Sequence, residues 1–279
     1  MTTLTLTYRG EKGAHVDMTG LAEALERGDI NHAMLKVRGL PVPLGDIFSV
    51  KGKVAAPWTQ ERNGALTIEA GNARLSRVGY GWRHGALHID GNSGDDVGRG
   101  MTGGKVVIEG HAGHHAGCGM KGGALTIKKS VGDYAGGNAT GGLFGMEGGV
   151  IHVYGNGGRH IGHKMRRGVI LIEGQGGAYG ASHMVAGTII IMGACATGWG
   201  RGMRRGSLVM LQGKEKTLTT GAFAYNGVHA LPFLNVMTRH VATLSKKCAS
   251  LMEKHAVKGM ARHMGDVTHM GKGEVWLPA

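Results

Sequence analysis

The sequence has few of the residues that mark fibrous, disordered or disulfide-rich chains. Proline occurs only 5 times in 279 residues, which excludes a collagen helix and a proline-rich linker. Aromatic residues are 5% and charged residues 18% of the chain, but the hydrophobic fraction of 42% is too high for a disordered protein. The three cysteines, Cys118, Cys195 and Cys248, include no CxxC pair and are too widely spaced to indicate a disulfide framework. We therefore expect a protein of the reducing cytoplasm.

Long apolar runs and targeting signals are also missing. No run approaches the ~18 apolar residues of a membrane-spanning helix. The first residues lack the basic segment and apolar core of a secretory signal, so we expect neither export nor a membrane segment.

Acidic residues are scarce relative to basic ones. The chain has 32 Lys and Arg against 19 Asp and Glu, a formal net charge of +13, and most of the excess follows residue 63. Such a balance favours a polyanionic partner, which is a nucleic acid, an acidic protein surface or an acidic small molecule.

Glycine is the residue in excess, with 54 of 279 positions against a usual ~7%. Its distribution reveals a repeat of about 19 residues. One step is seven residues longer, because of an insertion near Asn138 to Leu143, and an imperfect unit starts at Gly64. The other units begin at Gly85, Gly104, Gly123, Gly149, Gly168, Gly187 and Gly206.

Each unit opens with two apolar residues at alternate positions, for example Val106 and Ile108, and has a methionine near its end. A period of two places both side chains on one face of a strand. These methionines are Met101, Met120, Met146, Met165, Met184 and Met203. A unit this short suits one coil of a right-handed β-helix, with glycine at the corners and equivalent residues stacked in columns. We therefore predict a mainly β solenoid of seven to eight coils over residues 64–213.

The two flanking regions are expected to close the ends of the solenoid. Residues 1–63 predict a small α+β cap with strands at 4–8 and 34–37, a helix at 21–26 capped by Thr19 and ended by Gly28, and a turn-rich segment at 40–48. Residues 214–279 predict a helical extension and a final strand near 271–277. Its single amphipathic helix would begin near Pro232 and lie along the solenoid or against a partner. Its apolar stripe is Leu234, Met237, Val241, Leu244, Cys248 and Leu251.

No catalytic constellation is evident in the repeats. His111, His114, His115 and Cys118 have the chemistry of metal ligands, but they occupy a glycine-rich corner where neighbouring side chains diverge. We therefore expect surface or packing histidines and no metal site. No orienting base is evident for Cys118 as a nucleophile, and neither a phosphate-binding loop nor a nucleophile elbow is present.

Basic residues recur at equivalent positions, either just after the methionine or two residues before it. Stacked coils lie ~4.8 Å apart, so these residues would form a stripe along one edge. Arginine suits carboxylates and phosphates, although a solvated edge that discourages strand pairing explains the same pattern. The candidate anion-binding residues are Arg83, Arg99, Lys121, Arg166, Arg167, Arg201, Arg204 and Arg205.

The repeat Gly-x-Leu/Val-x-Ile-x-Gly, continued by two further glycines and a methionine, resembles the C-type subunit of formylmethanofuran dehydrogenase. Residues 104–120 illustrate it, and the segment Pro41–Phe48 also fits that family. The resemblance covers about residues 30–213. The same type of β-helix forms the C-terminal domain of the glutamate synthase large subunit. Because the chain is rich in Arg and His and has no cluster-binding cysteines, it looks more like the counterpart in the bacterial formyltransferase/hydrolase complex.

The resemblance implies a non-catalytic scaffold subunit in one-carbon metabolism, within a hetero-oligomer that includes a hydrolase subunit, a formyltransferase subunit and a further, B-type subunit. That complex passes formyl groups from tetrahydromethanopterin to a methanofuran-type carrier (methylofuran) and on to formate. No cofactor would be tightly bound. The carrier's polyglutamate tail would be a transient ligand of the basic face.

Three other functions stay open at this stage. One is the C-type subunit of a tungsten or molybdenum formylmethanofuran dehydrogenase, and another is a free-standing enzyme, for which we find no acid or base pair. The third is a basic nucleic-acid-binding solenoid, which the 5% of aromatic residues does not favour.

Overall fold

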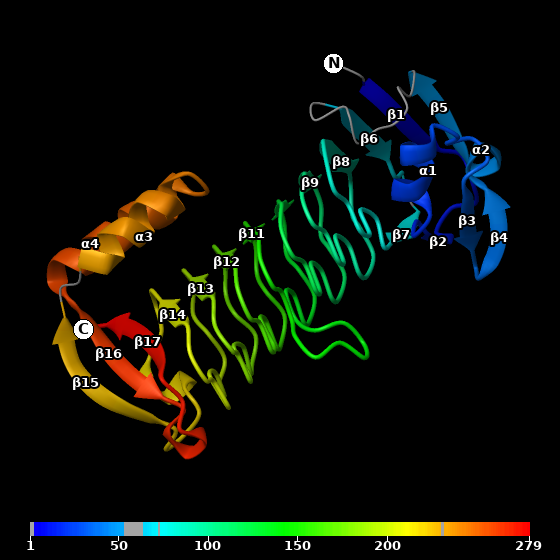
Figure 1. The fold of residues 1–279 in the computed structure, drawn as a ribbon. Helices are drawn as coiled ribbons and strands as arrows, with labels where there is room; N and C mark the ends of the chain where they lie inside the picture. Colours follow the sequence, from blue (N-terminus) through cyan, green and yellow to red (C-terminus); the bar gives the residue numbers. More distant parts are fainter. Residues whose placement is uncertain (1–2, 53–63, 72, 230–231) are drawn as a thin grey trace.

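The computed structural model describes residues 3–52, 64–71, 73–229 and 232–279. Its main feature is a 13-stranded sheet in the order β15-β16-β17-β14-β13-β12-β11-β10-β9-β8-β6-β1-β5 (Figure 1). Each repeat unit contributes one strand, and successive repeat strands pair in parallel. These strands are β6 (Ala65–Glu69), β8 (Ala86–Asp90), β9 (Lys105–Ile108), β10 (Ala124–Ile127), β11 (Val150–Val153), β12 (Val169–Ile172), β13 (Thr188–Ile191) and β14 (Ser207–Met210). The fold is therefore mainly β with a large parallel sheet.

The register of the sheet confirms the predicted apolar columns. Leu125 of β10 is paired with Val106 on one side and Ile151 on the other, and all three side chains are buried. A second column of isolated parallel bridges joins Ala112, Val131, Gly157, Gly176 and Cys195 on the return path of successive units. The repeating methionines, from Met101 to Met203, are fully buried as predicted. One core therefore runs along the whole stack.

Glycine at the corners has a direct steric cause. Gly117 and Gly136 have φ of +65° and +66°, in the left-handed region that side chains disfavour. A Cβ added at either position would lie 2.5 Å from the Cδ1 methyl group of an isoleucine two units further along the chain, Ile151 for Gly117 and Ile170 for Gly136. The column of isoleucines can therefore pack against the corner only because these positions have no side chain.

The N-terminal region extends the main sheet and adds a small second one. β1 (Thr3–Tyr8) pairs with β6 in parallel and with β5 (Phe48–Gly52) in antiparallel. The second sheet has the order β4-β3-β2-β7. Its strands are β4 (Leu40–Pro43), β3 (Met34–Val37), β2 (His15–Asp17) and β7 (Arg74–Ser76). The segment at 40–48 is therefore more regular than a succession of turns, because it contains β4, α2 (Leu44–Ile47) and the start of β5.

The helix α1 (Leu21–Arg27) forms where the sequence predicts it, and Gly28 ends it with φ of 75°. The predicted cap by Thr19 is wrong. Gly20 occupies the N-cap position, and the Thr19 hydroxyl instead donates a hydrogen bond to Asp17.

The C-terminal region contains two helices where the sequence predicts one, α3 (Pro232–Ala242) and α4 (Lys246–Lys258). The chain breaks between them because the Ser245 hydroxyl accepts a hydrogen bond from the Cys248 backbone N–H at 3.2 Å and starts a new helix. The apolar spacing continues across this break, so the pattern alone resembles one helix. The side chain of Leu234 lies outside the described residues.

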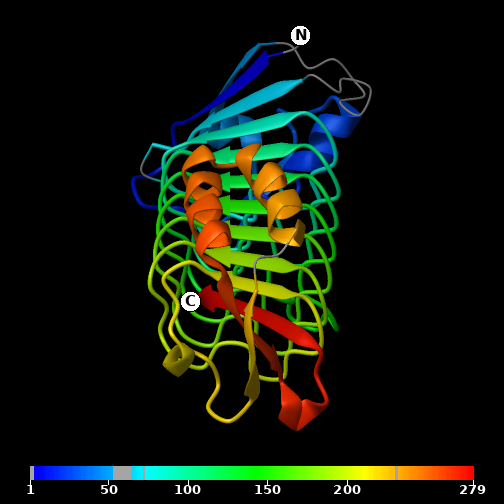
Figure 2. The same ribbon diagram turned by 90° about the vertical axis from the view of Figure 1, so that its left-hand side faces the viewer.

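The apolar stripe of these helices packs on the outer face of the sheet (Figure 2). Of the two predicted placements, along the solenoid or against a partner, the structure shows the first. Val241, Cys248 and Met252 are buried there in a second core with side chains of the sheet. The residues they meet are Leu171, Ile190, Met192, Val209 and Trp276.

The chain ends with three antiparallel strands that continue the sheet beyond β14. They are β15 (Phe223–His229), β16 (Met260–Gly265) and β17 (Gly273–Pro278), the last of which was predicted. Short 3-10 turns occur at Glu215–Thr217 and Val267–His269. No helix within the described ranges is long and apolar enough to cross a membrane.

Candidate functional site

The predicted basic residues lie on the side of the coils that leads back to the sheet. Backbone hydrogen bonds fix equivalent positions there, since Lys121 donates to Met101, Arg166 to Met146 and Arg204 to Met184 at 2.7–2.8 Å. The column immediately after the methionines is not uniformly basic, because a threonine, a glutamate and a valine alternate with the cations. Along the stack it contains Arg83, Thr102, Lys121, Glu147, Arg166, Val185 and Arg204. Cations of this column are thus two coils apart, which is about 9.6 Å.

Three of the predicted residues have carboxylate partners. Arg83 lies 3.8 Å from Glu26, Arg99 lies 3.3 Å from Asp96, and Arg166 lies 3.8 Å from Glu147. The other five are Lys121, Arg167, Arg201, Arg204 and Arg205, which are exposed and form no ion pair with any described carboxylate. Carboxylates therefore neutralise Arg83 and Arg99 near the N-terminal region, whereas at the other end of the predicted stripe, which we call the unpaired end, only Arg166 has such a partner.

Further cations lie beside the unpaired end. Lys164 and His183 occupy equivalent positions on neighbouring coils, with φ of 54° and 53°, where other coils have glycine. Burial lowers the pKa of His183, and the positive charges of His269, Lys164 and Arg201 lower it further. Sequence reasoning missed Lys164 and His183 because we compared the positions just after the methionine and two residues before it, whereas these two residues directly precede Met165 and Met184. We use the term cationic face for Lys164, Arg166, Arg167, His183, Arg201, Arg204 and Arg205.

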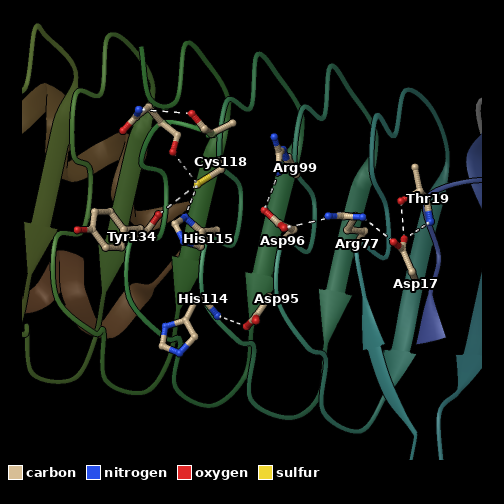
Figure 3. Close-up of polar contacts among 12 residues, drawn as sticks. Asp17, Thr19, Arg77, Asp95, Asp96, Arg99, His114, His115, Cys118 and Tyr134 are labelled. Atoms are coloured by element: carbon tan, nitrogen blue, oxygen red, sulfur yellow. Dashed lines mark hydrogen bonds and ion pairs between the residues drawn. The ribbon is translucent and has the colours of Figure 1, made fainter. Parts of the chain in front are cut away.

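A column of left-handed residues that are not glycine borders the cationic face. Arg77, Asp96, His115, Tyr134, His160 and Tyr179 occupy the same corner in successive coils, with φ between 53° and 62°. Four of them stack their rings, and we call His115, Tyr134, His160 and Tyr179 the aromatic ladder (Figure 3 shows its first two members). Neighbouring ring centroids are 5.1, 4.7 and 5.3 Å apart, with interplanar angles of 11°, 9° and 21°.

His163 lies between the aromatic ladder and the cationic face. Its Nδ1 is 2.8 Å from the Ser182 hydroxyl, and its ring meets those of Tyr134 and His183 edge to face. Burial, together with the positive charges of His183 and Lys164, lowers the pKa of His163 to about 4. At neutral pH this histidine is therefore uncharged.

Two histidines of the glycine-rich corner accept hydrogen bonds from the backbone of the next coil. Nδ1 of His111 accepts a hydrogen bond from the Ser130 N–H at 3.3 Å, and Nδ1 of His114 accepts one from the Asp133 N–H at 3.0 Å. Both rings thus tie one coil to the next. The part of the chain that the structure describes contains no group of three His, Cys, Asp or Glu side chains arranged to hold a metal ion.

The three thiols have environments that keep them protonated; Cys118 and Cys248 are buried, and Cys195 is partly buried. Cys118 does have a histidine neighbour, since its sulfur lies 3.6 Å from Nδ1 of His115 (Figure 3). Burial nevertheless raises the pKa of Cys118 to about 12, and the Asp96 charge adds to this effect. Burial likewise raises the pKa of Cys195 and of Cys248 to about 12. A thiol that stays protonated at neutral pH is a poor nucleophile.

Comparison with solved structures finds a relative of known identity. The chain is 33% identical to a chain in the crystal structure of the formyltransferase/hydrolase complex (FhcABCD) from Methylorubrum extorquens in complex with methylofuran. The TM-score is 0.86, and the match covers 99% of both chains. The chain therefore belongs to the family of subunits of formyltransferase/hydrolase complexes. The predicted relation to a subunit of the bacterial formyltransferase/hydrolase complex is thereby confirmed. No protein-family model and no curated protein sequence matches the chain.

Proposed function

We propose that this formyltransferase/hydrolase family member is a non-catalytic subunit, a right-handed β-helix that serves as scaffold and holds the acidic tail of a methanofuran-type carrier on its cationic face. In this role it assembles with a hydrolase subunit, a formyltransferase subunit and a further, B-type subunit. Those partners transfer the formyl group from tetrahydromethanopterin to the carrier and hydrolyse it to formate. The parallel stack of coils and its relative in a complex with methylofuran support this proposal.

The observation that carries the proposal is the unpaired end of the cationic face. The exposed residues that form no ion pair with a described carboxylate are Arg167 on one coil and, two coils further along the stack, Arg201, Arg204 and Arg205. A flexible chain of carboxylates can follow such a row and replace the missing partners. Because each exposed pair contributes only ~0.2–1 kcal/mol, binding has to be multivalent and sensitive to salt.

The described residues supply charged groups that can bind a ligand, but their thiols and His163 are poorly placed to act as a nucleophile or a base. Burial holds the three thiols protonated, and His163, whose pKa is lowered to about 4, shares a hydrogen bond with the hydroxyl of the buried Ser182. We therefore assign formyl transfer and hydrolysis to the partner subunits.

The test changes the four unpaired arginines Arg167, Arg201, Arg204 and Arg205 together to Gln and assays the assembled complex with carrier at two ionic strengths. A matched control changes four exposed lysines of α4 to Gln, which removes the same charge elsewhere on the molecule. These lysines are Lys246, Lys247, Lys254 and Lys258. We expect the arginine variant alone to have a higher apparent KM for carrier, an unchanged kcat and a flatter salt response. An unchanged KM and an unchanged salt dependence would contradict the proposal, because these arginines would then only keep the edge of the coils solvated.

A further inference from the structure

The seven-residue insertion lies outside the hydrogen bonds that close its coil. Met146 donates a backbone hydrogen bond to Gly136 at 2.8 Å, and the corresponding bond of the preceding coil joins Met120 to Gly117. The coil is thus closed beneath residues 138–144, which we call the insertion loop. It projects from the stack on the side away from α3 and α4 (Figure 1, green).

The insertion loop is held in shape by its own hydrogen bonds. The Asn138 side-chain amide donates to the Gly142 carbonyl at 3.0 Å, and the Gly142 N–H donates to the Ala139 carbonyl at 2.8 Å. The loop contains no charged residue, yet it presents a leucine to solvent, since Leu143 is 81% exposed. A hydrogen-bonded loop that exposes a leucine has the geometry of a docking contact rather than of a solvated turn.

The base of the insertion loop is cationic. The Arg166 guanidinium lies over the Phe144 ring at 4.8 Å and pairs with Glu147 at 3.8 Å. Lys164, whose carbonyl accepts from the Gly145 N–H at 2.8 Å, lies on the adjacent coil. A second copy of this chain would bring the same positive charges to the contact, which opposes self-association through this surface.

We propose that the insertion loop inserts Leu143 into an apolar pocket of a partner subunit, and that acidic side chains at the rim of this pocket face Lys164 and Arg166. The relative is part of a complex of several subunits and matches this chain over 99% of its length, so partners of this kind are available to a chain of this family. Leu143 is the anchor, and Phe144, braced by Arg166, holds the tip in place.

The test uses the full chain co-expressed with the other subunits of its complex. One variant is Leu143→Asp. A second variant deletes residues 138–144, which restores the 19-residue repeat, because Gly136-Gly137-Gly145-Met146 then corresponds to Gly117-Cys118-Gly119-Met120. The control, Leu40→Asp, adds the same charge at a leucine that is 70% exposed in β4. Binding to the partners is measured by co-purification and titration, and the melting temperature of each isolated chain is measured in parallel.

We expect both loop variants to bind the partners at least roughly tenfold more weakly, with the melting temperature of the parent and with Leu40→Asp unaffected. Parental binding by the loop-deleted chain would overturn the proposal. So would an equal loss in Leu40→Asp, or a loss that accompanies a lower melting temperature. An isolated parent that is a dimer, and becomes monomeric on Leu143→Asp, would show that the loop binds a second copy instead. A loss of assembly is also distinct from the higher KM in an intact complex that tests the carrier proposal.

Discussion

The guanidinium of Arg77 joins Asp17, which is sixty residues away in the sequence, to Asp96 in the next coil. Its Nη1 lies 2.5 Å from Asp17, and its Nε lies 3.7 Å from Asp96 (Figure 3). Asp17 ends β2 of the small N-terminal sheet, so the ion pair fastens this region to the repeats. Burial alone would raise the pKa of Asp17, but hydrogen bonds from Thr19 and the charge of Arg77 outweigh it and lower the pKa.

Asp17→Asn should destabilise the protein by about 1–2 kcal/mol, because it removes the charge that Arg77 and Thr19 satisfy. We keep the value low since Arg77 is 41% exposed. Urea unfolding near neutral pH measures the change. The control is Asp29→Asn, which alters an exposed pair with His32 and should change the stability little. Equal effects of the two variants would contradict a fastening role for Arg77.

Ile172→Ala should cost about 2–5 kcal/mol, since Ile172 is fully buried between Val153 and Ile191 of the neighbouring strands. Val257→Ala, at a residue that is 88% exposed, should change the stability by less than about 0.5 kcal/mol. Chemical denaturation compares the two. An Ile172→Ala variant as stable as its parent would mean that the column does not carry the core.

The regular part of this fold could be predicted from the sequence because its causes are local and repeated. A leading glycine, two alternating apolar residues and a methionine recur in each unit, so the register of one coil predicts that of the next. The same reasoning placed β3 and α1, whose boundaries depend on nearby residues. It failed at Thr243–Ser245, where a serine starts a second helix without changing the apolar period.

The candidate site was predicted less completely, for a different physical reason. The two positions compared around each methionine predicted eight basic residues. They did not reveal that Glu147 and Val185 interrupt the column, and they left out Lys164 and His183, which directly precede Met165 and Met184. The aromatic ladder was missed altogether. Its members have a backbone conformation that usually requires glycine, and only contacts between coils compensate for the strain.

Tyr134 contributes two stacked contacts to the aromatic ladder, with His115 and His160. Tyr134→Asn removes the ring and keeps a residue that tolerates positive φ, so it isolates the stacking from the backbone strain. We expect a loss of about 1–3 kcal/mol in the free energy of unfolding, since each aromatic pair is worth about 0.5–1.5 kcal/mol. The comparison is Tyr80→Asn at an exposed tyrosine, and a loss no larger than in this comparison would mean that the ladder adds no stability.

His163 should make the stability of the protein fall as the solution is acidified. Its pKa is about 4 in the folded protein, against 6.5 for an unperturbed histidine, because burial and the charges of His183 and Lys164 oppose protonation. Between these two values the unfolded chain binds a proton that the folded chain does not, so unfolding is favoured as the pH falls from 6.5 towards 4. Below about 4 both states are protonated and the loss stops growing.

His163→Gln removes this titration and keeps a side chain that can hydrogen-bond Ser182. The free energy of unfolding, measured by urea from about pH 7 to about pH 4.5, should therefore vary less steeply with pH than in the parent. The slope should not vanish, because burial also lowers the pKa of His152, His160 and His183. His84→Gln, which changes an exposed histidine, should keep the parental slope. If His163→Gln also kept it, the proton taken up on unfolding would have to belong to the other histidines, and burial and the charges of His183 and Lys164 would not hold His163 uncharged.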